Sequence, residues 1–338
     1  MPQFRRAAGR VLPAVMLCAI AGCAPVRTVT PAPPPPGMPT TGTDRAAGVD
    51  SPPGADTVEV REVAILFEGS SSDYADVAAQ LIRLLPPERY RLTPTDIHVE
   101  DSQRILGGLG GRPGLLVVAI GLRAARFARD QLSAPVVFAQ VFNHQELLVE
   151  GRLMRGIAAI PPLDLQLQDW KKVDPGLHRV GLIVSDRHAD LIREAEQAAR
   201  TTGVTIQHEI SSSDQETLYL FKRLVPGIDG FWLVPDDRIL SPAVLRELLG
   251  YAVSHNVRVS VFSDSLLEWG AVLSASATAP DVARTVRDVL ERMIAGDAGH
   301  APALTPLSEV AVRINATVAN RLGLASPAGA SWIVRSEP

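Results

Sequence analysis

Polar residues follow several apolar runs of this sequence, and their side chains are suited to holding a small molecule through hydrogen bonds and charge. They carry hydroxyl, amide, imidazole and carboxylate groups and are Ser70, Ser71, Ser72, Asn143, His144, Ser185, Asp186, Asp236, Asp237, Ser263 and Asp264. Serine hydroxyls beside the free N–H groups at the start of a helix suit an anion such as a carboxylate. A carboxylate such as that of Asp236 suits an ammonium group.

Helix capping explains some of the same residues without any ligand. Ser72 or Asp73 could cap the helix that begins near residue 72, because a side-chain oxygen at that point accepts a hydrogen bond from the first helical turn. Each of the other polar residues, taken alone, is of a kind that is more often a cap or a turn residue, although their occurrence at several successive strand ends favours a lined cleft. The sequence leaves both interpretations open, so these residues are candidate ligand contacts.

The sequence lacks the residue spacings that known catalytic and metal-binding motifs require. It has no nucleophile elbow, no zinc-protease helix motif, no phosphate-binding glycine loop and no paired zinc ligands. The glycines at 107–111 precede an apolar run, whereas a dinucleotide-binding loop follows one. His144 could respond to pH, and an ammonium contact or a cap accounts for the adjacent Asp236 and Asp237. We therefore predict no enzymatic activity, no cofactor and no metal.

Short apolar runs alternate with amphipathic stretches through most of the chain. Strands are expected at 63–67, 115–120, 135–138, 179–184, 204–210, 229–234 and 257–262, with helices between them up to residue 85 and at 123–131, 189–202, 215–224 and 242–255. Continuous apolar runs of this kind indicate a parallel sheet covered on both faces. The two blocks predict an α/β fold with two doubly wound parallel-sheet lobes, in which the polar residues meet at the carboxyl ends of strands.

The N-terminal segment has the pattern of a secretory signal. Three arginines precede an apolar stretch at 11–20 that is too short to span a bilayer, and small residues lead to Cys23. The ending Ile-Ala-Gly-Cys at 20–23 resembles the lipobox of bacterial lipoproteins. This resemblance implies that residues 1–22 are a signal peptide and that Cys23 is acylated, as in palmitate-bearing lipoproteins.

Residues 23–56 are rich in Pro, Thr, Gly and Ala, with four consecutive prolines at 33–36. This composition predicts a partly extended tether rather than a folded element. Ala24, not Asp, follows the lipidated cysteine, and by resemblance to lipoprotein sorting in enterobacteria this favours the outer membrane. The expected location is the periplasmic face of a bacterial membrane, with the folded body held by its lipid anchor.

Charge and cysteine content exclude several other classes of protein. The formal net charge is −4 and the calculated pI is near 6.0, so the basic surface of a nucleic-acid-binding protein is not expected. The second cysteine, Cys18, lies within the predicted signal peptide. The mature chain would therefore have no disulfide and no cysteine-based metal site.

Three stretches of the body carry a resemblance to a known family. The first, 156–183, contains Gly156-Ile157-Ala158 and His178-Arg179-Val180-Gly181-Leu182-Ile183. The second is Asp229-Gly230-Phe231-Trp232-Leu233-Val234-Pro235-Asp236-Asp237. The third, 259–324, contains Trp269-Gly270-Ala271-Val272-Leu273-Ser274 and Val312-Arg313-Ile314-Asn315. In order and spacing this resembles the substrate-binding lipoproteins of ABC transporters, which have the periplasmic-binding-protein type I fold. The branch it resembles includes binders of amino acids.

This resemblance implies a clamp of two lobes with a ligand between them. Lobe one would take 57–156 and 264–300, lobe two would take 157–262, and 301–338 would form the hinge return and C-terminal segment. The chain would cross between the lobes near Gly156, Phe262 and Ile314. The implied function is capture of a small polar ligand, such as an amino acid, for an inner-membrane ABC permease.

The sequence departs from the family at several cleft positions. Gln140 to His144 replace the usual Asp-Pro, Asp237 replaces an Asn, and 275–279 lack the usual Tyr. These departures support an alternative, in which an envelope lipoprotein keeps the clamp fold but acts as a sensor or regulatory subunit through contacts with a protein partner.

Overall fold

The structure of the chain is a computed structural model, and it describes residues 60–97, 102–297, 302–324 and 331–335. The predicted signal peptide, the lipidation site at Cys23 and the tether at 23–56 lie outside the described residues. Within the described ranges, no helix combines the length and apolar character needed to cross a bilayer.

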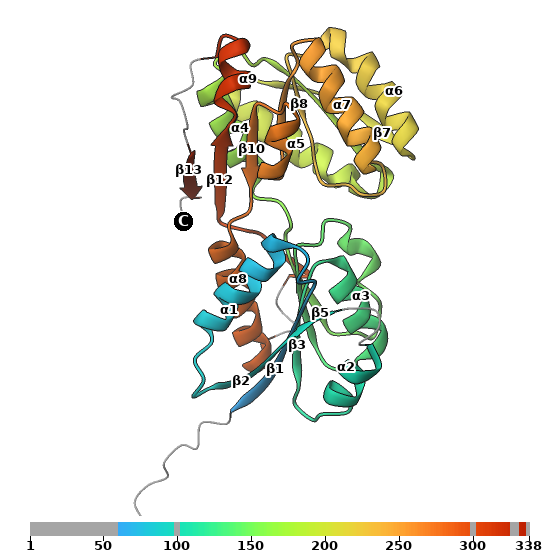
Figure 1. Cartoon of the computed structure of the whole chain (residues 1–338), viewed down its shortest axis with the longest axis vertical. Coiled ribbons are helices and arrows are strands. Elements are labelled where there is room, and N and C mark those ends of the chain that lie inside the picture. The colour runs from blue at the N-terminus through green and yellow to red at the C-terminus, as the bar shows by residue number, and fades with distance from the viewer. Residues whose placement is uncertain (1–59, 98–101, 298–301, 325–330, 336–338) are drawn as a thin grey trace, which may run out of the picture. The chain divides into compact units, whose positions relative to one another are not determined.

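Two β-sheets organise the described chain into two lobes, which are visible in Figure 1. Lobe one contains a six-stranded sheet in the order β11-β5-β4-β3-β1-β2. Its strands are β1 (Arg61–Phe67), β2 (Tyr90–Asp96), β3 (Leu116–Ile120), β4 (Val136–Ala139), β5 (Met154–Ile157) and β11 (Leu304–Thr305), and its helices are α1 (Ser72–Leu84), α2 (Ser102–Leu109), α3 (Leu122–Gln131) and α8 (Ala279–Ile294).

Lobe two contains a seven-stranded sheet in the order β13-β12-β10-β9-β8-β6-β7. Its strands are β6 (Arg179–Ser185), β7 (Thr205–Ser211), β8 (Gly230–Trp232), β9 (Arg258–Val261), β10 (Leu273–Ser276), β12 (Glu309–Ile314) and β13 (Ser331–Arg335), and its helices are α4 (Leu163–Val173), α5 (Ala189–Thr202), α6 (Asp214–Leu224), α7 (Pro242–Ser254) and α9 (Ala316–Arg321).

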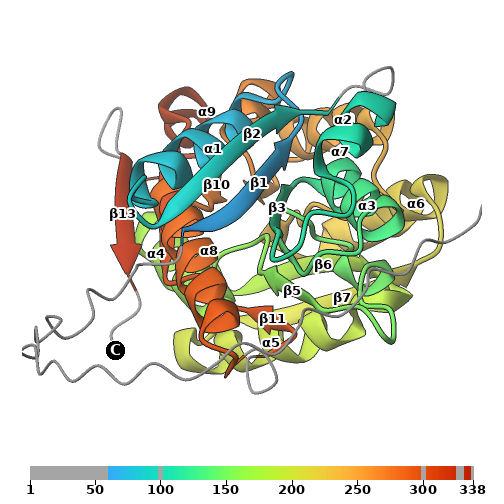
Figure 2. The ribbon, with the colours of Figure 1, turned by 90° about the horizontal axis from the view of Figure 1, so that it is seen from below.

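The expected fold class is confirmed, and β1 shows why the sequence could predict it. Val63 and Ile65 pack under α1 and α8, whereas Ala64 and Leu66 pack on the opposite face with α2 and α3. Figure 2 shows the lobe-one strands with helices on both sides. A strand buried on both faces needs apolar residues at every position, and this gives the continuous apolar runs.

The two lobes repeat one strand order. β2-β1-β3-β4-β5 in lobe one corresponds to β7-β6-β8-β9-β10 in lobe two, and all of these neighbours are parallel. The strands β12 and β13 are antiparallel additions to lobe two. In each lobe the order reverses between its first and third strand, which is where open α/β sheets bind ligands.

The local sequence predicted some helices and strands correctly but did not reveal others. α5 ends at Thr202, as expected, and Gly203 follows it with φ of 67°, a left-handed cap that glycine adopts without strain. β2 was not expected, and its Pro94 is a residue that strands seldom contain. The strand is at the edge of the sheet, where a missing N–H is tolerated.

The lobe boundaries differ from those expected after residue 262. The turn Asp264–Trp269 and β10 belong to lobe two, because Leu273 of β10 pairs with Ser260 of β9 and adds a fifth parallel strand. The second crossing therefore lies between β10 and α8, not near Phe262. The third lies between β11 and β12, not near Ile314. The first crossing follows β5.

A buried carboxylate ties the second and third crossings together. Asp281, in the first turn of α8, is 1% exposed and accepts hydrogen bonds from the backbone N–H groups of Ser308 and Glu309, both at 2.9 Å. The Ser308 hydroxyl donates to the same carboxylate at 2.7 Å. Glu309 accepts from the Thr278 hydroxyl at 3.1 Å and from Arg284 at 2.7 Å. The two hinge segments are therefore held as one unit.

Replacing Asp281 by asparagine should destabilise the fold. Both backbone N–H groups donate to one carboxylate oxygen, and the Ser308 hydroxyl and Arg284 donate to the other. The amide nitrogen of asparagine would therefore face donors in either orientation, and the free energy of unfolding should fall by about 2–3 kcal/mol. Chemical denaturation at neutral pH measures the change. Asp288→Asn on the same helix is the control. Among the described residues this exposed carboxylate pairs only with adjacent Arg287, so its loss should change stability by less than about 0.5 kcal/mol. Equal effects of the two substitutions would contradict the hinge role.

Candidate ligand-binding site

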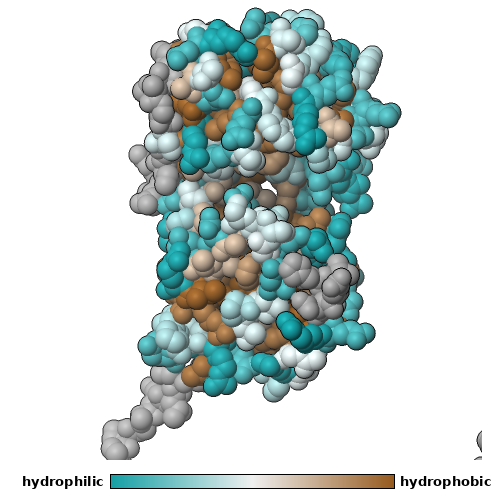
Figure 3. Space-filling model, in the orientation of Figure 1, coloured by the Kyte–Doolittle hydropathy of each residue, from teal (hydrophilic) through white to brown (hydrophobic). Residues whose placement is uncertain are grey.

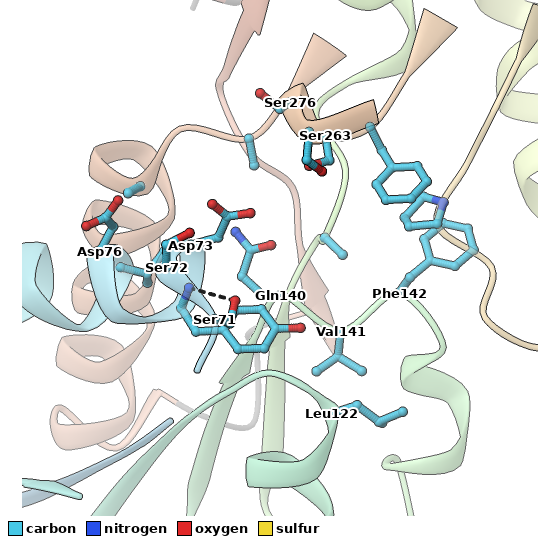
Figure 4. Close-up of a pocket in the computed structure, with 18 of the residues that line it drawn as sticks. Ser71, Ser72, Asp73, Asp76, Leu122, Gln140, Val141, Phe142, Ser263 and Ser276 are labelled. Carbon is cyan, nitrogen blue, oxygen red and sulfur yellow. Dashed lines mark hydrogen bonds between the residues drawn. The ribbon is translucent and has the colours of Figure 1, made fainter. Parts of the chain in front are cut away.

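A cavity of about 700 Å³ lies where the carboxyl ends of the strands of both lobes meet. Figure 3 shows that the surface is hollowed between the lobes, and Figure 4 shows side chains from both lobes around the space. Strand register explains the convergence: Phe67, Ile120 and Ala139, which end β1, β3 and β4, pair side by side. The residues that follow them are consequently neighbours.

The first turn of α1 forms one wall of the cavity. Ser71 is the N-cap, and its hydroxyl accepts the backbone N–H of Tyr74 at 3.5 Å. The cap is thus Ser71, not Ser72 or Asp73 as considered from the sequence. Ser72, Asp73 and Asp76 line the cavity with it, and Figure 4 shows these residues on the same stretch of helix. Two hydroxyls and two carboxylates are therefore presented together.

Gly121 makes room for Tyr74, an aromatic wall of the cavity. Gly121 has φ of 88°, and a Cβ at this position would lie 2.5 Å from a carbon of the Tyr74 ring. Burial raises the pKa of the Tyr74 phenol, and the negative charges of Glu68, Asp73 and Asp237 raise it further. The phenol is therefore neutral at physiological pH and keeps its O–H donor.

Gln140 lies in the cavity lining at the end of β4 with an unusual backbone conformation. Its φ is 59°, one of two positive values among the non-glycine residues that the structure describes. A side chain held in the left-handed region costs free energy, and such residues gather at functional sites. This conformation turns the chain between Ala139 and Val141, both buried, and leaves the Gln140 amide at the cavity.

A direct hydrogen bond joins the lobes at the cavity. Asn143 lies in the connection after β4 and Asp237 in the loop after β8, and the amide nitrogen of Asn143 donates to the Asp237 carboxylate. Both residues line the cavity. Asn143 is 7% exposed, so its amide orientation is fixed by its partners rather than by water.

Asp236 does not lie in the cavity, contrary to expectation. Its side chain is fully buried and accepts backbone N–H groups from Ser185 at 3.0 Å and from Arg238 at 3.3 Å. It joins the end of β6 to the loop after β8. The carboxylate that faces the cavity is that of the next residue, Asp237.

The other residues expected to contact a ligand lie at different places in the structure. Ser263 and Asp264 line the cavity, and Asp264 forms an ion pair with Arg313 at 2.9 Å. Ser185 and Asp186 line a second cavity of about 320 Å³ beside α6. Ser70 lies in the turn before α1, and His144 in the turn after Asn143; neither is among the residues that line the main cavity.

The charge of the cavity is negative. Four of its lining residues are carboxylates, and among the described residues that line it none is Lys, Arg or His. Asp73, Asp76 and Asp237 form no ion pair within the described part of the chain. Such a surface repels anions and attracts cations. In the described ranges, no group of three or more His, Cys, Asp or Glu has the arrangement to hold a metal ion.

Sequence reasoning missed several residues that line the cavity. Asp73 and Asp76 were not expected as contacts, although a spacing of three places both on one helical face. Phe262 directly follows β9 and Ser276 is the last residue of β10, so the strand-end rule that selected Ser263 could have found them. Phe142 adds a second ring from lobe one.

Comparisons with solved structures identify the fold. No protein-family model and no curated protein sequence matches this chain. A substrate-binding protein with adhesive properties from Clostridium difficile, in its ligand-free, open form, aligns with a TM-score of 0.57 and 14% identity, over 80% of this chain and 97% of its own. The fold is that of type I periplasmic binding proteins.

Two further structures show the same fold. A conserved domain protein from Vibrio cholerae has a TM-score of 0.55 and 15% identity over 80% of this chain and 97% of its own. An ABC domain in complex with L-Trp from Streptococcus pneumoniae has a TM-score of 0.54 and 16% identity over 80% and 96%. At this identity the likeness concerns the fold.

Asp236 and Asp237 should respond differently to substitution. Asp236→Ala leaves two backbone N–H groups without their acceptor in a buried place, so the free energy of unfolding should fall by about 2–3 kcal/mol. Asp237→Asn keeps an acceptor for Asn143 and should cost less than about 1 kcal/mol. Urea denaturation of both variants tests this, and a smaller loss for Asp236→Ala than for Asp237→Asn would overturn the assignment.

Proposed function

We propose that this protein is a solute-binding protein that captures a small polar ligand between its two lobes. The cavity lined by both lobes at the carboxyl ends of their strands carries this proposal. A ligand that contacts both lobes stabilises one relative position of them, because it adds contacts that neither lobe makes alone. The three-segment hinge permits such a movement.

The ligand should carry a positively charged amine. Asp237 is the acceptor best placed for an ammonium group, because it faces the cavity and already accepts one hydrogen bond from Asn143. The Ser71 and Ser72 hydroxyls suit uncharged polar groups of the ligand. A free carboxylate at that wall would meet Asp73 and Asp76, so the carboxylate site expected from the serines is disfavoured. Tyr74, Phe142 and Phe262 can cover an apolar part of the ligand.

The proposal includes attachment and delivery. Cys23 would carry the lipid anchor, residues 23–56 would be the tether, and the body would work on the periplasmic face of a membrane, with the outer membrane favoured by Ala24. The partner would be an inner-membrane ABC permease. The likeness in fold to substrate-binding proteins supports the delivery partner, and the Ile-Ala-Gly-Cys ending at 20–23 supports the anchor.

A ligand panel measured by thermal unfolding of the purified full chain tests the function. The panel contains amines, amino acids, sugars and carboxylic acids. A ligand that binds only the folded state at about one hundred times its Kd adds about 2.7 kcal/mol, and we expect this for cationic amines. Asp237→Asn should weaken that binding about tenfold or more, while Glu247→Gln, an exposed carboxylate on α7, should not. A well-folded protein that responds to nothing would favour action through a protein partner.

Lipid attachment is tested separately. Cys23→Ser should abolish incorporation of labelled palmitate and move the protein from the membrane to the soluble fraction, because the thiol is the acceptor of the lipid. Immunoblots of fractionated cells give the readout. Retention of label in the variant would rule out Cys23 as the site.

A further inference from the structure

A buried histidine contacts Asn143, the donor of the hydrogen bond that joins the lobes. His188 ends the short turn after β6 in lobe two and is 4% exposed. Its Nε2 lies 2.8 Å from the amide oxygen of Asn143, in lobe one. Its Nδ1 lies 3.2 Å from the amide nitrogen of Gln145, also in lobe one. The ring of Phe142 packs against it with centroids 4.1 Å apart.

The donors and acceptors of this group allow one consistent arrangement. The Gln145 amide nitrogen can only donate, and it does so to the Arg187 carbonyl at 3.2 Å as well as to His188. Nδ1 of His188 is therefore the acceptor, and Nε2 carries the proton and donates to the Asn143 oxygen. The Asn143 nitrogen then donates to Asp237. We call this chain, Gln145–His188–Asn143–Asp237, the relay.

We infer that His188 is the positioning residue that sets the Asn143 amide toward Asp237 at the cavity, and that proton uptake by His188 breaks the relay. A proton on Nδ1 would face the Gln145 amide group donor to donor. Turning that amide would place its oxygen against the Arg187 carbonyl, which repels it. The contact between the lobes is therefore strongest with a neutral ring.

Charged and titratable groups from three elements face the imidazole. Asp236 and Arg238 approach from the loop after β8, Asp190 from α5 and His144 from the turn after β4. Burial is the largest influence and lowers the pKa of His188; Asp236 and Asp190 oppose it, while His144 and Arg238 add to it. The unfolded value is about 6.5.

The direction of the pH dependence follows from this order of values. Because the folded-state pKa of His188 lies below its unfolded value, the neutral ring contributes its full stability above about pH 6.5. That contribution is lost as the pH falls below this value toward the folded pKa. The consequence for ligand affinity rests on the proposed function, whereas the relay and its effect on stability do not.

Nuclear magnetic resonance of the histidine ring nitrogens in the full chain tests the arrangement. At about pH 7.5 the His188 ring should be the Nε2–H tautomer, and its pKa should lie below the usual histidine value of about 6.5. The signal is assigned by its absence in His188→Gln, or by elimination with variants of the other histidines if that protein does not fold. An Nδ1–H tautomer, or a pKa of His188 at or above the usual histidine value, would overturn the inference.

The pH profile of thermal stability tests the function of the relay. A glutamine at 188 keeps an amide donor near the Nε2 position but does not titrate. When the pH is lowered from about 7.5 to about 5, the midpoint of thermal unfolding should therefore fall less in His188→Gln than in the native chain. His178→Gln, an exposed control, should follow the native profile. Parallel profiles for His188→Gln and the native chain would refute proton control.

Ligand affinity gives the final readout once the panel has supplied an amine that binds. Its Kd should rise about tenfold over the same pH interval in the native chain and stay nearly constant in His188→Gln. If the affinity depends on pH equally in the native chain and in His188→Gln, the relay does not control binding at the cavity, while the proposed function stands. A panel without any binder would instead fail the proposed function, with the tautomer and stability results still deciding on the relay.

Discussion

The burial of one carboxylate in the hinge constrains much of what the two lobes can do. Asp281 accepts three hydrogen bonds from Ser308 and Glu309 of the third crossing and a fourth, at 3.4 Å, from Arg284 of its own helix, which begins directly after the second crossing. Neither crossing can shift alone without exposing or orphaning a buried charge, a costly step. Ser276, Ala277 and Ala279 line the cavity in the same stretch of chain. A ligand held there would act on the hinge itself, so binding and lobe movement would share one set of residues.

Electrostatics and packing place opposite demands on the cavity. Three carboxylates without ion-pair partners repel one another, and only their exposure to water keeps that cost low. A cation held between them would replace that water and relieve the repulsion. The aromatic rings from both lobes make the same space partly apolar. A ligand with an amine and an apolar body satisfies both conditions, whereas an anion satisfies neither.

Prediction from the sequence succeeded where burial dictates residue type at every position, as in β1, and where a local signal such as Gly203 ends a helix. It failed for β2, whose Pro94 is tolerated only because tertiary structure puts the strand at an edge. The lobe boundary was misplaced because β9 and β10 belong to one sheet, which only long-range pairing decides. Asp236 and Asp237 could not be told apart, since the direction of adjacent loop side chains depends on the surrounding fold. The partners of His188 lie about forty-five positions away and left no local pattern.

The relay implies that ligand capture releases protons and that the heat of binding includes this release. Its donors point in one direction, and the chain ends on a negative charge, so each link is polarised by the next. Thermodynamic coupling is reciprocal: if protonation of the imidazole weakens capture of a cation at Asp237, capture must expel a proton from the imidazole to the same degree. At mildly acidic pH, a receptor built in this way would release a proton from the imidazole when it binds a cation. The heat of capture would then depend on the ionisation enthalpy of the buffer that takes up the proton.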